Sequence, residues 1–165
     1  MLEIVIVRFV TYCVLVVSLC QPTVAQSQAF ICFPQASGGV TFNTTTQRWV
    51  GTTFTVPERW IVRRVTNEDR ERLDETLRRL GYQLNIFAEL RDAAGWVEVP
   101  GRDLPILGCE SGFGAGPRVV SCSDAVSIFR MSTTTLRFAY ATINSADLIQ
   151  EGRTPNAMAG ICSRL

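Results

Sequence analysis

Four cysteines beyond the amino-terminal segment constrain this chain more than any other feature. Of six cysteines, two lie in an apolar leader, and the four that follow are Cys32, Cys109, Cys122 and Cys162. If the chain is exported, four such cysteines indicate two disulfides. Metal binding competes with this interpretation, but no C-x-x-C spacing occurs and the chain has no histidine. We therefore predict disulfides, and neither a metal site nor a cofactor.

The spacing of the cysteines favours one of the three possible pairings. A glycine-rich stretch separates Cys109 from Cys122, so the chain can turn back and join these two locally. Cys32 and Cys162 then remain, near the two ends of the mature chain. A chain-entropy model assigns about 3 kcal/mol to the local bridge and about 5 kcal/mol to the end-to-end bridge.

The first 25 residues are organised like a secretory signal peptide. Arg8 precedes a short apolar run, Phe9–Cys20, and small residues ending at Ala25 form an A-x-A-like cleavage site. The run is shorter than the roughly 20 residues of a membrane-spanning helix. An uncleaved anchor, a lipid on Cys20 and a wrong start codon are the alternatives. We expect cleavage after Ala25, which leaves one soluble, secreted or periplasmic domain, residues 26–165, with no membrane span.

The charge of the chain argues against polyanionic partners. Sixteen basic residues balance 15 acidic ones, for a formal net charge of +1. No field of one sign is available to attract nucleic acid or an anionic membrane. The arginine doublets at 63–64 and 78–79 lie among acidic or apolar residues, and we expect them on solvated faces.

Short segments of alternating polarity predict a mainly β domain. Residues 40–56 indicate a hairpin with a polar turn at 43–47, because aromatic and β-branched residues recur there at period two. Further strands are expected at 59–65, 82–90, 96–100, 103–109, 118–122, 126–131, 136–144 and 158–162. About eight to ten short antiparallel strands are typical of a single sandwich or barrel, and the pattern does not choose between the two.

One segment, about 67–80, breaks this pattern and predicts an amphipathic helix. Thr66 or Asn67 can cap its start, acidic residues fill its first turns, and Gly81 follows its end. Its apolar stripe consists of Leu73, Leu77 and Leu80. Because this stripe is narrow, we expect the helix to pack on the outside of the sheet.

Few residues offer catalytic chemistry. The absence of histidine excludes a Ser-His-Asp triad and a Cys-His pair, and bonded cysteines would leave no thiolate. Two carboxylates about 5–10 Å apart could still perform acid–base work. The candidates, which no sequence spacing pairs, are Glu98, Asp103, Glu110, Asp124 and Asp147. The glycine-rich stretch 112–116 lies between the predicted cysteine partners rather than before a helix, so we interpret it as a hairpin tip and not as a phosphate loop.

Aromatic side chains are the remaining candidates for ligand contact. They could form a stacking face or line a cavity, although core packing is the favoured interpretation in a small β domain. The six are Trp49, Trp60, Trp96, Tyr82, Phe138 and Tyr140.

Two motifs resemble a known group. A cysteine near the mature start precedes G-x-x-F, a threonine-rich turn and W-x-x-x-x-F, and the chain closes with glycine, one residue, then Cys-Ser. This pattern is similar to that of a group of small, uncharacterised exported bacterial proteins. The resemblance implies export and no particular activity, and the helix at 67–80 and Arg153 depart from the group. It is carried by Gly39, Phe42, Trp49, Phe54, Arg137, Phe138, Thr154, Pro155, Gly160, Cys162 and Ser163.

The function that these features favour is that of an exported, non-catalytic binding module. It could carry a small ligand, or inhibit a secreted protein through an exposed loop such as Gly112–Pro117. A structural or envelope-associated protein is the alternative, and an enzyme that uses carboxylates is the least favoured hypothesis.

Overall fold

A computed structural model describes residues 29–56, 59–114, 116–142 and 155–165. Within them, nine strands form a single antiparallel sheet, and the predicted signal peptide lies outside the described residues. Along the chain the elements are β1 (Ala29–Asn43), β2 (Arg48–Thr53), β3 (Trp60–Arg64), α2 (Asn67–Arg79), η1 (Leu84–Phe87), α3 (Ala88–Asp92), β4 (Gly95–Glu98), β5 (Leu107–Ser111), β6 (Val119–Ser123), β7 (Ser127–Ser132), β8 (Arg137–Thr142) and β9 (Asn156–Arg164).

The sheet closes into a barrel. Strands β3 to β9 follow one another in chain order, and β1 pairs with both β3 and β9, so eight strands complete the ring and β2 stays outside it. The prediction of a mainly β, antiparallel fold is confirmed, and of the two architectures left open the barrel is the one that forms. Closure removes the unpaired edges that an open sheet would expose.

The length of β1 makes this closure possible. One edge of β1 pairs with β9 from Phe30 to Gly39, while the other edge pairs first with β3 and then with β2. The strand is irregular between Pro34 and Ala36, where its register against β9 shifts. Proline has no N–H to donate, which is why it is confined to such irregular or edge positions. The sequence pattern indicated only the end of this strand, from residue 40 onward.

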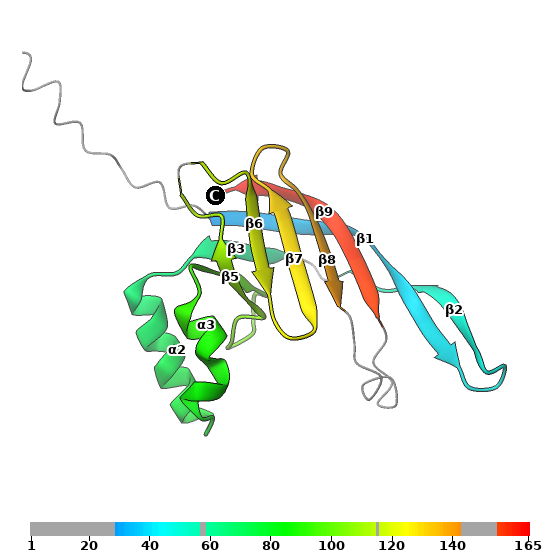
Figure 1. Cartoon of the computed structure of the whole chain (residues 1–165), viewed down its shortest axis with the longest axis horizontal. Helices are drawn as coiled ribbons and strands as arrows, with labels where there is room; N and C mark the ends of the chain where they lie inside the picture. The colour runs from blue at the N-terminus through cyan, green and yellow to red at the C-terminus, as the bar shows by residue number, and fades with distance from the viewer. Residues whose placement is uncertain (1–28, 57–58, 115, 143–154) are drawn as a thin grey trace, which may run out of the picture.

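The predicted hairpin is confirmed as β1 and β2, and it extends away from the ring of strands (Figure 1). Asn43 Oδ1 accepts hydrogen bonds from the backbone N–H groups of Thr45 and Thr46, both at 3.0 Å, and so holds the turn. Phe42 lies opposite Trp49 in the register, and their ring centroids are 5.3 Å apart. Two aromatic residues of the resemblance motif therefore stabilise this hairpin by cross-strand contact.

The interior of the barrel is filled at one end by apolar and sulfur-containing side chains. Both predicted disulfides are present, and each joins directly opposed residues on neighbouring strands: Cys32 with Cys162 where β1 meets β9, and Cys109 with Cys122 on β5 and β6. The buried core also contains Phe30, Trp60, Val62, Val97, Leu107, Val120, Phe129, Met131 and Phe138.

Two glycines allow close packing around this core. A Cβ atom on Gly160 of β9 would lie 2.2 Å from the carbonyl oxygen of Phe33 and 2.7 Å from the Phe138 ring. A Cβ atom on Gly95 would lie 2.1 Å from the ring of Phe113. Phe113 belongs to the loop between β5 and β6 and packs on the core, and Gly112 is buried. The expectation of an exposed hairpin tip is therefore wrong for the first part of this loop.

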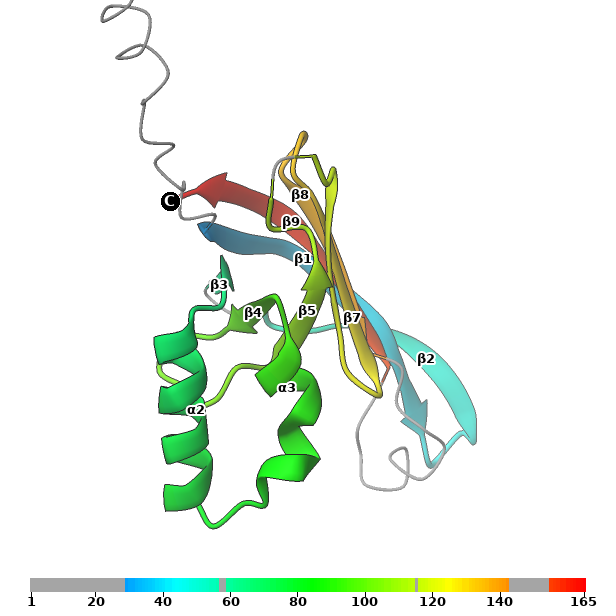
Figure 2. The same cartoon turned by 60° about the vertical axis from the view of Figure 1, so that its left-hand side comes forward.

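The predicted helix is confirmed as α2. Thr66 and Asp69 form a reciprocal capping box at its start, and the helix ends at Arg79, two residues before Gly81. Leu73 and Leu77 are buried, whereas Leu80 is 44% exposed. The buried leucines share a second core cluster with Trp96 of β4, whose neighbour Val97 points into the barrel. Figure 2 shows α2 and α3 together beside β3, β4 and β5, so the helix packs on the outside of the sheet as predicted.

The strand predicted at 82–90 is wrong, because this segment forms η1 and α3. The alternation that indicated a strand included Ile86, which is 68% exposed. The side chains that reach the second core cluster are instead Leu84, Phe87 and Leu90, at a spacing of three. That spacing places them on one face of a helical segment, so packing against the outer side of the barrel overrides the weak β pattern.

No helix in the described ranges combines the length and apolar character needed to cross a membrane.

Candidate functional site

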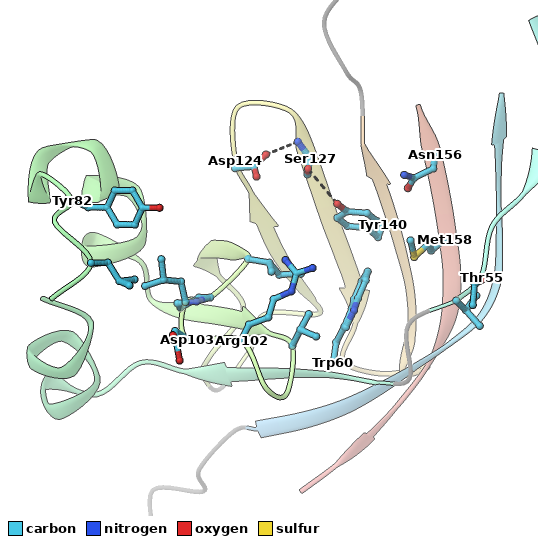
Figure 3. A pocket seen from close by; sticks show the side chains of 16 residues that line it. Thr55, Trp60, Tyr82, Arg102, Asp103, Asp124, Ser127, Tyr140, Asn156 and Met158 are labelled. Carbon is cyan, nitrogen blue, oxygen red and sulfur yellow. Dashed lines mark hydrogen bonds between the residues drawn. The ribbon is translucent and has the colours of Figure 1, made fainter. Parts of the chain in front are cut away.

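The two ends of the barrel differ. Phe113 packs at the end near Gly95, whereas the opposite end opens into a pocket of about 860 Å³, which we call the mouth (Figure 3). Trp60, Tyr140 and Met158 form the floor of the mouth. Its wall includes the loop between β4 and β5, and its rim includes residues from the turn between β6 and β7, from β9 and from the segment after β2. Pockets of this size at the mouth of a β-barrel are common ligand sites.

Aromatic side chains build the floor through the alternation of β8 and β3. Phe138 and Tyr140 are two residues apart on β8 and therefore face the same side of the strand. The Tyr140 ring meets the Trp60 ring edge to face at 5.0 Å, and Phe129 and Phe138 pack against Trp60 from within the core. Trp60 is only 3% exposed, so the core fixes the position of the floor.

Polar groups in the mouth leave hydrogen-bonding capacity unused. Thr142 Oγ1 donates to the Tyr140 hydroxyl at 2.6 Å, and that hydroxyl donates to Ser127 Oγ at 3.3 Å. The hydroxyl hydrogen of Ser127 remains able to donate, since a serine is both donor and acceptor. Asn156 Oδ1 is buried and has no hydrogen-bond partner in the described part of the chain. A buried acceptor without a donor is uncommon, and its position in the mouth is consistent with contact to a bound molecule.

Three charged side chains line the mouth: Arg102, Asp103 and Asp124. Asp124 Oδ1 accepts hydrogen bonds from the backbone N–H groups of Val126 and Ser127, at 2.8 and 2.6 Å, so this carboxylate holds the turn between β6 and β7. The guanidinium of Arg102 points into the mouth beside Trp60, and the carboxylate of Asp103 is directed away from it (Figure 3). No described side chain forms an ion pair with Arg102.

Three of the six aromatic candidates line the mouth, namely Trp60, Tyr82 and Tyr140. Trp60 and Tyr140 come from the barrel itself, whereas Tyr82 follows α2, is 49% exposed and contacts Phe87 with ring centroids 5.3 Å apart. Tyr82 thus lies on the far side of the mouth from the floor (Figure 3).

The other three aromatic candidates lie elsewhere. Phe138 is part of the barrel core beneath the floor. Trp96 lies on the outer face of β4 under the helices, and its Nε1 donates to the carbonyl oxygen of Leu90 at 2.8 Å. Trp49 belongs to the hairpin and is 45% exposed. The six residues therefore do not make one stacking face, and core packing accounts for Phe138 and Trp96.

The candidate carboxylates are also separated. Asp103 and Asp124 both line the mouth, but they do not point toward one another (Figure 3). Glu98 is paired with Arg63 on the outer face of β4, and Glu110 is exposed on β5. Asp147 lies outside the described residues.

A second, smaller pocket of about 600 Å³ lies outside the barrel between α2 and β4. A charge network lines this pocket: Arg63 contacts Asp69 at 2.6 Å and Glu98 at 2.8 Å, and Arg72 also pairs with Asp69. Burial raises the pKa of Asp69, but hydrogen bonds from Arg63 and Thr66 outweigh it and hold that pKa well below its ordinary value.

The expectation that the arginine doublet at 63–64 lies on a solvated face is wrong for Arg63. Arg63 belongs to a doublet expected on a solvated face, yet its side chain is only 23% exposed and is enclosed by two acids from different elements. Because these charged groups pair with one another, we assign them a structural role: they hold α2 against β3 and β4.

Several residues of the mouth were not among the sequence candidates, including Arg102, Ser127, Asn156 and Met158. One signal could have found two of them. Cys162 must point inward if it pairs with Cys32, and strand alternation then places Met158 and Asn156 on the same inward face of β9.

Comparison with family models, curated proteins and solved structures finds no match for this chain, so its function has to be inferred from the mouth of the barrel.

Proposed function

We propose that this protein is an exported, non-catalytic binding module that holds a small ligand in the mouth of its barrel. One observation carries the proposal: the barrel is filled with side chains at one end but opens at the other into a pocket of about 860 Å³ with an aromatic floor. A pocket of roughly 300–1,000 Å³ suits a small organic molecule. Floor residues held by the core are preorganised, so ligand binding does not require them to become ordered.

The chemistry of the mouth favours binding over catalysis. Acid–base hydrolysis needs two carboxylates that face a common substrate, and Asp103 and Asp124 are directed to different sides. Asp124 is also engaged by two backbone N–H groups. What the mouth offers instead is an apolar floor with a few polar groups around it, the arrangement typical of ligand recognition.

Two disulfides support the exported part of the proposal. Both bonds are buried in the barrel, and stable structural disulfides are found mainly in proteins of oxidising compartments. The secreted or periplasmic location itself rests on the leader at residues 1–25, which has the organisation of a signal peptide.

The carrier version of the hypothesis is better supported than the inhibitor version. An inhibitor was expected to use the loop Gly112–Pro117, but Gly112 is buried and Phe113 packs against the core. Less of this loop is therefore exposed for contact with a partner protein than the inhibitor version requires.

Native mass spectrometry of the disulfide-intact protein, purified from a bacterial periplasm, tests the proposal. We expect a dissociable small molecule on the wild-type protein and its loss in Ser127→Phe, which places a large ring in the mouth. Ser163→Phe makes the same change at an exposed position on β9 and is the matched control. An empty wild-type protein that takes up nothing from a panel of apolar compounds would contradict the carrier function, and retention of the protein by peptidoglycan would favour an envelope role.

A further inference from the structure

We propose that the mouth selects an apolar ligand that carries one anionic group, and that Arg102 recognises the anion. This inference rests on the proposed function, since it names the chemical class of the ligand for the same pocket. Among the described residues that line the mouth, Arg102 is the single basic side chain. Its guanidinium is an always-charged donor that matches carboxylate, sulfonate and phosphate oxygens.

The backbone holds Arg102 at the edge of the mouth. Its N–H donates to the carbonyl oxygen of Val99 at 3.1 Å, which closes a tight turn in the loop between β4 and β5. Farther along this loop, the N–H of Ile106 donates to the carbonyl oxygen of Val97 at 2.8 Å and returns the chain to the barrel. The side chain therefore begins from a fixed point and extends toward Trp60 of the floor (Figure 3).

The two acids near Arg102 do not neutralise it. The Asp124 carboxylate is bound to two backbone N–H groups of its own turn, and the Asp103 carboxylate is directed away from the mouth. Neither acid forms an ion pair with Arg102 in the structure. An anion that enters the mouth thus meets a guanidinium whose donors are uncommitted.

The apolar part of the ligand is defined by the floor. Trp60 and Tyr140 lie on the side of the mouth toward which the Arg102 side chain points (Figure 3), and Met158 and Ile106 are further apolar residues of its lining. A flat apolar body can rest on these rings while its acidic group faces the guanidinium. A neutral ligand would gain the same floor contacts but would lack the charge-assisted hydrogen bonds.

Two fluorescent probes with nearly the same aromatic skeleton separate these contributions. 1-Anilinonaphthalene-8-sulfonate carries a sulfonate, and N-phenyl-1-naphthylamine lacks it. We expect the wild-type protein to bind the sulfonate about threefold to tenfold more tightly, the range expected for a partly exposed charge pair. Arg102→Gln should remove this preference and leave the affinity for the neutral probe within about twofold. Higher salt should weaken binding of the sulfonate selectively.

Arg118→Gln removes an exposed arginine at the opposite end of the barrel and is the matched control. Thermal unfolding of each variant establishes that the fold is retained, so that binding to a loosened core is not mistaken for binding in the mouth. If the wild-type protein binds neither probe, the proposed function fails. If it binds both probes equally, or if Arg102→Gln and Arg118→Gln weaken sulfonate binding alike, the role of Arg102 is overturned while ligand binding by the mouth stands.

Discussion

The two disulfides make a natural pair of experiments on how chain topology stabilises this barrel. Each joins directly opposed residues on adjacent strands, and all four cysteines are between 0 and 4% exposed. Replacing either pair by alanine therefore removes a similar amount of buried sulfur. The bonds differ in the loop that they close, because the sequence separation is 130 residues for Cys32–Cys162 and 13 residues for Cys109–Cys122.

The difference in loop length determines how much stability each bridge is expected to contribute. Loop-closure entropy assigns about 5 kcal/mol to the larger loop and about 3 kcal/mol to the smaller one at 25 °C. The Cys109–Cys122 bridge lies inside the larger loop and shortens that loop by about a tenth. The loop-closure entropy of the larger loop hardly changes, because it depends on the logarithm of the loop length. We expect the double variant Cys32→Ala/Cys162→Ala to lose about 2 kcal/mol more stability than Cys109→Ala/Cys122→Ala.

Guanidinium unfolding followed by circular dichroism measures the difference. With a slope of about 4 kcal/mol per molar, the midpoint should fall by about 1.2 M for the end-to-end bridge and by about 0.7 M for the local bridge. Equal falls, or a larger fall for the local bridge, would refute the reasoning. Such a result would mean that native-state packing, and not the constraint on the unfolded chain, determines what each bridge contributes.

Three further perturbations probe other parts of the structure. Gly160→Ala should lower the free energy of unfolding by about 2 kcal/mol or more, because the new Cβ would lie 2.2 Å from a backbone carbonyl oxygen. Gly51→Ala is the control, since nothing lies within 4 Å of a Cβ atom at that position, and it should change thermal stability little. Similar losses of stability in the two variants would argue against the close approach at Gly160. Asp69→Asn should destabilise the protein by about 2 kcal/mol at neutral pH. The folded-state pKa of Asp69 lies below its ordinary value of 3.8, so the stability that the ionised carboxylate contributes is present above pH 3.8 and is lost as the pH falls further. Urea unfolding should therefore show a smaller difference in stability between wild type and Asp69→Asn at pH 3 than at pH 6. A difference that does not depend on pH would contradict the ion pair with Arg63. Phe113→Ala should lower the free energy of unfolding by about 2 kcal/mol yet leave binding of the two fluorescent probes unchanged, because Phe113 packs at the end of the barrel opposite the mouth. A parallel loss of probe binding would show that the two ends of the barrel are coupled.

Local signals in the sequence predicted the elements whose stability is local. The helix α2 depends on the capping box of Thr66 with Asp69 and on leucines one turn apart, all of which are visible in the sequence. The β1–β2 hairpin depends on a turn held by Asn43 and on residues that alternate beside it. The disulfide pairing followed from spacing, because a glycine-rich stretch made one pair local and left the other two cysteines for each other.

Residues 82–90 show where local signals fail. Their alternation was consistent with a strand, but Phe87 and Leu90 are partly buried by contact with the cluster around Trp96, which comes from a different element. The energy of that contact exceeds the small intrinsic preference of the segment for either structure. Contact with the outer surface of the barrel, rather than the local sequence of the segment, therefore selects the helical conformation.

The sequence by itself determined a disulfide-bonded, mainly antiparallel β domain with one external amphipathic helix, because covalent spacing, capping and periodicity act over short distances along the chain. Only the tertiary structure decided that β1 closes a barrel against β3 and β9, and which side chains face the mouth. Trp60 and Trp96 illustrate the reason: each is 3% exposed, yet one points into the barrel and the other lies beneath the helices. Alternation divides a strand into two faces, but when both faces are buried, only the packing of distant elements determines which face surrounds the site.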